Sequence, residues 1–291
     1  LLHCGPFGNI AHGCNSILAT RAALALGDVV VTEAGFGADL GAEKFFDIKC
    51  RTAGLSPEAC VVVGTVRALK LHGGVPLKEL GRDDPDAVRR GADNLIRHVE
   101  NVRKYGVPVV VSLNRFVTDT DAELEAFREA VAPTGARIAY TDVWANGGAG
   151  ALELADAVTD TLASEPSHFR PLYPLELSLT AKIETIAREI YGADGVDYTA
   201  EAARDLDRLE AAGLRELAVC MAKTQYSFSD DPRKLGRPTG FRITARKVRP
   251  SAGAGFVVVE TGDIMTMPGL SASPAAERMS IGPDGEIVGL A

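Results

Sequence analysis

The chain has 291 residues, of which 46% are hydrophobic and 24% are charged, and its formal net charge at pH 7 is −8. This composition is typical of a soluble globular protein of two or three domains, and no apolar run approaches the roughly 20 residues that a membrane-spanning helix requires. The excess of Asp and Glu over Lys and Arg argues against a general nucleic-acid binder, because affinity for a phosphate backbone depends on clustered positive charge.

The first elements expected along the chain are a helix and a strand. Residues 15–26 have the apolar spacing of a helix, with Asn15 or Ser16 as cap and Gly27 as stop. Residues 29–31 are three valines, and such a β-branched run indicates a strand that is buried on both faces.

A glycine-rich turn follows this expected strand. Gly35, Gly37 and Gly41 allow backbone conformations and close approaches that a Cβ would prevent, and Asp39 can cap the next helix. A strand, a glycine loop and a helix in this order direct backbone N–H groups at one point, which favours a phosphate. The spacing matches neither G-x-x-x-x-G-K-[ST] nor G-x-G-x-x-G, so a tight connection without a ligand remains an alternative.

An acidic side chain and an apolar helix face flank this turn. Glu33 lies just past the expected strand, at the sheet edge where open α/β proteins bind ligands, and is a candidate for holding Mg²⁺ against phosphate oxygens. Phe45, Phe46 and Ile48 have the spacing of one helix face. Residues 61–65 read as the next buried strand, and the strand, helix and strand predict a parallel pair with a right-handed crossover.

The middle of the chain alternates strands and helices. A long helix starts near Pro85 and ends near Tyr105, with Leu95, Val99 and Val102 on one face. Strands are then expected over residues 107–113 and 137–141, and helices over 121–132 and 150–164. This alternation predicts an α/β protein with a doubly wound parallel sheet.

Two loops at the carboxyl ends of these strands carry aromatic side chains. Phe116 follows one strand, and Trp144, the only tryptophan, follows the next. Two such rings can clamp a planar ligand by offset stacking, which contributes about 0.5–1.5 kcal/mol per pair beyond area burial. The alternative is that Trp144 only fills the end of the sheet.

The last third of the chain begins after a connector that contains three prolines at positions 166, 171 and 174. Helices are expected over residues 179–190 and 200–212, the second capped by Thr199. Four strand-like segments without long helices between them predict a small, mainly antiparallel sheet over residues 217–221, 241–248, 256–260 and 286–290.

The cysteines indicate the cellular compartment of the protein, and the first residue indicates whether the sequence is a fragment. The five cysteines are odd in number and form no Cys-x-x-Cys pair, which favours reduced thiols in a cytoplasmic protein. The sequence starts at Leu1 and has no signal-peptide pattern. We therefore expect the chain to be a fragment.

Residues 32–50 have the sequence Thr-Glu-Ala-Gly-Phe-Gly-Ala-Asp-Leu-Gly-Ala-Glu-Lys-Phe-Phe-Asp-Ile-Lys-Cys. This sequence closely resembles that of the formate–tetrahydrofolate ligase family. Four other segments resemble the same family in the same order, namely residues 3–16, 65–74, 221–231 and 262–270. The resemblance covers essentially the whole chain, and it corresponds to the C-terminal portion of such a ligase.

The resemblance implies P-loop-NTPase-like doubly wound sheets. Residues 1–97 would be the remainder of a nucleotide-binding domain, 98–205 a second α/β domain with the folate-site loops, and 206–291 a small mixed or antiparallel domain. It also implies a cytoplasmic, homo-oligomeric enzyme that uses ATP to ligate formate to tetrahydrofolate through formyl phosphate, with Mg²⁺ and a candidate monovalent cation. The catalytic residues, including the P-loop lysine, are expected in an absent N-terminal part, so the isolated chain is expected to be inactive.

The same resemblance assigns roles to residues of this chain. In the family, aromatic side chains hold the pterin ring of tetrahydrofolate, and Phe116 and Trp144 are the matching positions, with Phe36 as a third candidate. The glycine loop and Glu33 are the candidates for phosphate and Mg²⁺. The family pattern has a small residue where Arg115 stands.

Other readings remain open. A different ligase or NTPase on the same scaffold would use the two aromatic loops to hold a purine, and an inert fragment would only supply a folded interaction domain. Residues 223–231 either line a cleft or form a structural turn. His72, His98 and His168 show no acid–base partner in the sequence and receive no catalytic role.

Overall fold

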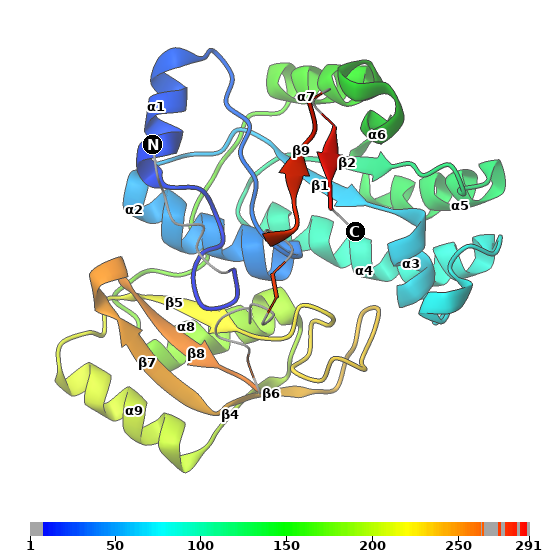
Figure 1. The fold of residues 1–291 in the computed structure, drawn as a ribbon. Helices are drawn as coiled ribbons and strands as arrows, with labels where there is room; N and C mark the ends of the chain where they lie inside the picture. Colours follow the sequence, from blue (N-terminus) through cyan, green and yellow to red (C-terminus); the bar gives the residue numbers. More distant parts are fainter. Residues whose placement is uncertain (1–7, 263, 265–272, 275–276, 284–285, 290–291) are drawn as a thin grey trace.

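The computed structural model describes residues 8–262, 264, 273–274, 277–283 and 286–289. In this part of the chain, helices pack around two groups of strands (Figure 1). No helix that the structure describes is long and apolar enough to cross a membrane.

The first group is a parallel sheet of three strands. β1 (Cys60–Gly64), β2 (Val109–Asn114) and β3 (Arg137–Thr141) lie in the order β1-β2-β3, and β2 pairs in parallel with both neighbours. All residues of β2 except the last are buried, as expected for a central strand of an α/β sheet. Four helices alternate with the strands: α3 (Val66–His72), α4 (Pro85–Lys104), α5 (Asp121–Val131) and α7 (Leu152–Ser164). The predicted alternation is confirmed.

Side-chain caps explain where several helices begin. In α5, Thr120 Oγ1 accepts the Glu123 N–H at 3.2 Å and the Glu123 carboxylate accepts the Thr120 N–H at 3.1 Å, which is a complete capping box. Ser16 caps α1 (Ile17–Leu26), and Thr199 caps α9 (Ala200–Ala211), both as predicted.

The strand predicted over residues 29–31 is wrong. Val29 and Val31 are 69% and 91% exposed, and the segment pairs with no strand in the described part of the chain. Among the described residues, its neighbourhood contains one isolated antiparallel bridge, between Cys14 and Ala34. A β-branched run forms a strand only where another strand completes its hydrogen bonds, and β1 stands here at the edge of its sheet. The predicted parallel pair between this segment and β1 is therefore wrong as well.

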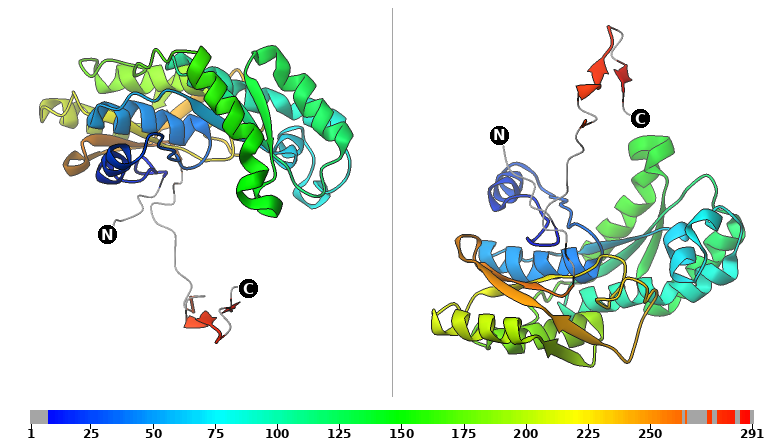
Figure 2. Two further views of the ribbon diagram at one scale, coloured as in Figure 1. Left: turned by 90° about the horizontal axis from the view of Figure 1, so that it is seen from above. Right: turned by 60° about the horizontal axis from the view of Figure 1, so that its bottom comes forward.

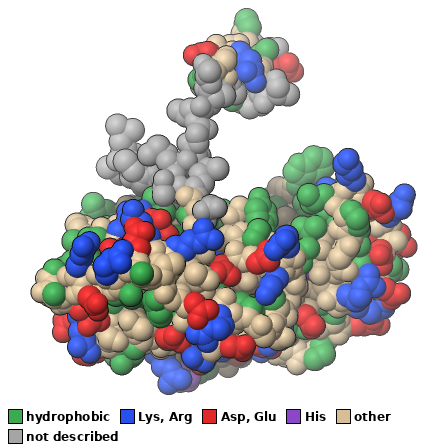
Figure 3. All heavy atoms as spheres, turned by 90° about the horizontal axis from the view of Figure 1, so that it is seen from below, with side chains coloured by type: hydrophobic (Ala, Val, Ile, Leu, Met, Phe, Trp, Pro, Cys, Tyr) green, Lys and Arg blue, Asp and Glu red, His purple; other side chains and the backbone are tan. Residues whose placement is uncertain are grey.

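Other apolar side chains near this segment are also exposed. In α1, the predicted apolar face includes Leu18 and Leu26, yet both are exposed and Thr20 is the one buried residue of that helix. Val63 of β1 is exposed too. On the face of the molecule drawn in Figure 3, by contrast, hydrophobic side chains are interspersed with Lys, Arg, Asp and Glu.

The second group of strands is mixed rather than mainly antiparallel. Its strands are β4 (Gly195–Tyr198), β5 (Ala218–Ala222), β6 (Arg242–Ala245), β7 (Lys247–Ser251) and β8 (Phe256–Glu260). β4 pairs in parallel with β6, β5 pairs in parallel with β8, and β7 runs antiparallel to β8. The prediction failed because it treated β6 and β7 as one strand, although the chain breaks between them at Arg246, and because it missed β4.

The last predicted strand is only partly described. β10 (Ile287–Val288) pairs antiparallel with β9 (Ser280–Ile281), and residue 290 of the predicted strand lies outside the described residues. The family-like segment 262–270 also falls almost wholly outside them.

A helical segment joins the two groups of strands (Figure 1, Figure 2). It comprises η1 (Ala38–Ala42), η2 (Phe45–Cys50) and α2 (Arg51–Ala53). Phe46 packs on Tyr105 beyond the end of α4, with ring centroids 4.7 Å apart, whereas Ile48 packs in a cluster with residues of β5 and β8. The predicted single apolar face is therefore wrong, because Phe46 and Ile48 are both buried but pack in different clusters on this helical segment.

Candidate functional site

The glycine turn bends at a phenylalanine. Phe36 has a φ of +62°, a left-handed conformation that costs a non-glycine residue about 1–3 kcal/mol and persists only where neighbours enforce it. A Cβ on Gly41 would overlap the Gly35 carbonyl, and one on Gly37 would lie 2.7 Å from Asp39 Oδ1. Internal packing thus already requires these glycines, and their contact with a phosphate stays a prediction.

The prediction that Asp39 caps the helix is wrong. Gly37 occupies the cap position, and the Asp39 carboxylate instead lies 3.1 Å from the Lys223 ammonium. Both side chains are buried, and the Lys223 ammonium also donates to the carbonyls of Thr224, at 2.8 Å, and Ser227. Burial lowers the pKa of Lys223, while the neighbouring Asp39 carboxylate raises it. The pair therefore joins the glycine turn to the segment 223–231.

Two more buried lysines, Lys44 and Lys49, attach residues 8–15 to the helical segment of η1, η2 and α2, which we call the central helix. Lys44 Nζ donates to the carbonyls of Gly8, at 2.9 Å, and Asn9, at 3.4 Å, and Lys49 Nζ donates to Asn15 Oδ1 at 2.8 Å. The Lys223 N–H donates in turn to Asn9 Oδ1 at 3.1 Å. Three of the family-like segments therefore meet around buried ammonium and amide groups.

The central helix also buries two carboxyl groups. Asp47 accepts hydrogen bonds from Tyr105 Oη and the Leu172 N–H, both at 2.8 Å, yet burial raises its pKa to about 6. Neither oxygen of Glu43 has a hydrogen-bond partner in the part of the chain described. Burial, and next the charge of Asp47, raise the pKa of Glu43 well above its ordinary value, which favours its protonated form.

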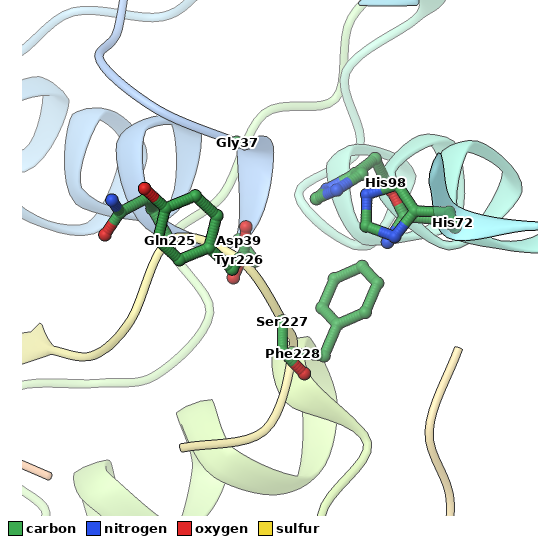
Figure 4. A pocket seen from close by; sticks show the side chains of 9 residues that line it. Gly37, Asp39, His72, His98, Gln225, Tyr226, Ser227 and Phe228 are labelled. Atoms are coloured by element: carbon green, nitrogen blue, oxygen red, sulfur yellow. The ribbon is translucent and has the colours of Figure 1, made fainter. Parts of the chain in front are cut away.

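A cavity of about 140 Å³ opens beside the Asp39–Lys223 pair (Figure 4). Figure 4 shows the rings of His72 and His98 on one side of it and the side chains of Tyr226 and Gln225 on the other. Its lining comes from the glycine turn, α3, α4 and the segment 223–231, and comprises Gly37, Asp39, His72, Asn94, His98, Gln225, Tyr226, Ser227 and Phe228. Residues 225–228 thus line a cavity, and the segment 223–231 also contains turns and bends, so each of the two hypotheses describes part of it.

Both histidines of the cavity are neutral at neutral pH. His72 Nδ1 accepts the Gly236 N–H at 3.0 Å, so its proton is on Nε2. Burial, followed by the nearby His98, lowers the pKa of His72 to about 4, and burial also lowers the pKa of His98. His98 packs on Phe228, and its Nδ1 is buried without a hydrogen bond to any described residue. Sequence reasoning missed both residues, because the groups around them come from distant segments.

The two aromatic loops lie side by side at the carboxyl ends of β2 and β3. The Arg115 N–H donates to the Thr141 carbonyl at 2.7 Å, which ties the Phe116 loop to the end of β3. Trp144, in α6 (Val143–Asn146), is 83% exposed, so the alternative that it fills the end of the sheet is wrong. Between the loops is a cavity of about 440 Å³, lined by Arg115, Asp121, Leu124, Glu125, Tyr140, Thr141, Asp142, Ala149, Gly150 and Glu153.

The described residues contain no ready metal site. Glu33 is exposed and follows no strand, and no group of three or more His, Cys, Asp and Glu side chains that could hold a metal occurs among the residues described. The cysteines that the structure describes are free thiols, at positions 14, 50, 60 and 220. Burial raises the pKa of the Cys14 thiol to about 11, which makes it a poor nucleophile.

Comparison with known proteins agrees with the resemblance in the sequence. A family model described as formate–tetrahydrofolate ligase matches residues 1–291. The chain is 58% identical over 290 residues to a formate–tetrahydrofolate ligase of Symbiobacterium thermophilum, and the match covers 99% of this chain and 52% of that protein. The chain thus spans about half the length of this curated relative. By its family match and by this identity, the chain belongs to the formate–tetrahydrofolate ligase family.

Proposed function

We propose that this chain supplies the folate-binding part of an ATP-dependent ligase that joins formate to tetrahydrofolate. The observation that carries the proposal is the pair of tied loops that presents Phe116 and the exposed Trp144 near a cavity of about 440 Å³, which is lined by Arg115 and Asp142 of the same loops rather than by the two rings. Rings on backbone segments that are hydrogen-bonded at the ends of sheet strands are suited to stacking on a planar ligand, because the loop backbone needs little ordering when the ligand binds.

The proposed reaction has two steps. Formate attacks the γ-phosphate of ATP to give formyl phosphate and ADP, and N10 of tetrahydrofolate then takes the formyl group and releases phosphate. Such chemistry depends on positioning and on stabilising phosphoryl charge. We propose Gly35, Gly37 and Gly41 as phosphate contacts and Phe36 as a further folate contact.

We also propose that the chain has a P-loop-NTPase-like sheet and that its domains meet after residues 97 and 205. The enzyme would use a monovalent cation and form a cytoplasmic homo-oligomer. Glu33 alone does not make a Mg²⁺ site, so it would act only with phosphate oxygens and with ligands outside the described residues. Glu33→Gln should then raise the Mg²⁺ requirement of the reaction, whereas Asp28→Asn, a matched exposed acid, should leave it unchanged.

Fluorescence of Trp144 tests ligand choice. Tetrahydrofolate should quench it saturably, with free tryptophan as the control for light absorbed by the ligand, and ATP should not compete. Quenching by ATP that folate cannot displace would instead favour a ligase or NTPase that holds a purine. A folded chain that neither ligand quenches would contradict the clamp.

Turnover tests the activity. We expect a chimera, in which this chain replaces the matching half of the Symbiobacterium thermophilum ligase, to turn over only with formate, ATP and tetrahydrofolate together. We expect this chain alone to show no turnover. A folded but inactive chimera would support the alternative that the chain is an inert interaction domain.

A further inference from the structure

Two half-exposed rings lie beside the small cavity, apart from the loops of Phe116 and Trp144. Phe36 is 46% exposed and Tyr226 is 59% exposed. Tyr226 lines the cavity, and so does Gly37, the residue next to Phe36 (Figure 4). The two rings thus come from segments far apart in the sequence that meet at one place.

The backbone under Phe36 is enforced by its neighbours. A Cβ on Gly8 would lie 3.2 Å from the Phe36 ring, and the Gly35 N–H donates to the Gly13 carbonyl at 3.1 Å. These contacts fix one side of the turn to residues 8–13. On its other side, the turn leads directly into Asp39, whose carboxylate pairs with Lys223.

Lys223 fixes the Tyr226 segment in the same way. Its ammonium donates to the carbonyls of Thr224 and Ser227, which flank Tyr226 on both sides, and lies 5.0 Å from the centre of the Tyr191 ring. The segment therefore wraps around the ammonium. Without this charge, the two carbonyls would lose their buried donor.

From this geometry we propose that Asp39 and Lys223 are positioning residues, whose ion pair holds the Phe36 and Tyr226 segments together so that both rings contact a planar, uncharged part of a substrate. The substrate part rests on the proposed function. An uncharged ring fits because the ion pair is neutral as a unit and the His72 and His98 side chains that line the cavity are neutral imidazoles, so these side chains present no net charge to the ring. Such a ring occurs both in tetrahydrofolate and in ATP.

Hydrogen exchange tests the positioning directly. The double variant Asp39→Asn with Lys223→Met leaves neither charge unpaired and should fold. We expect exchange to accelerate on the order of tenfold or more in both residues 34–41 and residues 223–228, with no change in α5. The matched control, Lys104→Met with Glu189→Gln, removes an exposed pair that is 2.8 Å apart and should affect neither segment. Acceleration in only one segment, or in α5 equally, would overturn the proposal.

Kinetics of the active chimera test the consequence for the substrate. The double variant, and Tyr226→Ala separately, should raise KM on the order of tenfold for the substrate that carries the ring, with kcat within about twofold. A rise for tetrahydrofolate but not ATP identifies the folate ring, and the reverse identifies adenine. Unchanged KM for both, or a fall in kcat alone, would refute the substrate contact. If the unmutated chimera has no activity, the proposed ligase function fails, and the exchange result still decides the positioning.

Discussion

The Arg115 N–H donates to the Thr141 carbonyl at 2.7 Å, so the loop that carries Phe116 is anchored at the point where the chain turns toward Trp144. A second hydrogen bond, from the Phe116 N–H to Asp119 Oδ2 at 2.9 Å, fixes that loop internally. The two aromatic side chains therefore lie on neighbouring backbone segments that are linked by a hydrogen bond.

We expect Trp144→Ala to weaken tetrahydrofolate binding on the order of tenfold and to leave nucleotide binding nearly unchanged, because an exposed ring contributes stacking rather than core packing. Calorimetric titration of the chimera with each ligand measures both affinities. Val117→Ala, at an equally exposed position of the partner loop, is the control and should change neither. Equal losses for both ligands at unchanged stability would contradict the clamp.

The side chains of Lys70 and Glu123 form a buried ion pair, 2.6 Å apart, between α3 and α5. We expect Glu123→Gln to destabilise the fold by about 3–5 kcal/mol at pH 7, since it leaves a buried ammonium unpaired. The matched control Glu125→Gln changes an exposed acid of the same helix and should have little effect. Denaturant midpoints measure both, and equal small losses would show that the Lys70 charge is otherwise satisfied.

The same pair gives a pH dependence with a definite sign. Burial opposes ionisation of Glu123, but hydrogen bonds from Lys70, Thr120 and Asp84 lower its pKa below the ordinary value. Its stabilisation is therefore present above the unfolded pKa and is lost as the pH falls through the folded pKa. The difference in unfolding free energy between the wild type and Glu123→Gln should shrink in acid.

Glu43 should act in the opposite direction. Its pKa is raised in the folded state, so the unfolded chain releases this proton first, and stability falls as the pH rises above the ordinary pKa. We expect Glu43→Gln, which cannot ionise, to gain stability relative to the wild type by about 1.4 kcal/mol per pH unit within that window. Unfolding at pH 4, 6 and 8 measures the difference. A constant difference would show that Glu43 is ionised in the folded state.

The exposed valines around residue 30 predict uneven protection from hydrogen exchange. We expect the amides of residues 17–33 to exchange much faster than those of β2, because the first segment has no strand partner among the described residues while β2 pairs on both sides. Hydrogen exchange read by mass spectrometry compares them. Equal protection would mean that the first segment is covered in solution, for example by another copy of the chain.

Sequence reasoning succeeded where the signal is local. The bounds of β3 match the prediction residue for residue, and the predicted cap residues Ser16 and Thr199 begin their helices through their side chains. The prediction failed at Val29, because a strand requires a partner that a single segment cannot reveal.

The candidate site residues likewise differ in whether a local sequence signal marks them. Phe116 and Trp144 could be proposed from the sequence because they follow predicted strands directly, and their role stays a prediction. The cavity of His72 and His98 was missed because its groups come together only through tertiary packing, and the one usable signal was the unexplained polarity of residues 223–231.

The hydrogen bond from the Lys223 N–H to Asn9 Oδ1 connects positions that are 214 apart in the sequence. Such a contact closes a long loop within the chain, and the entropy of closing it must be lost before the contact can form. The parallel sheet, whose strands follow one another within a short span, has no such requirement. We therefore expect the order of folding to separate the two sites, with the aromatic loops formed early and the buried lysine cluster assembled last, after the C-terminal strands have been synthesised.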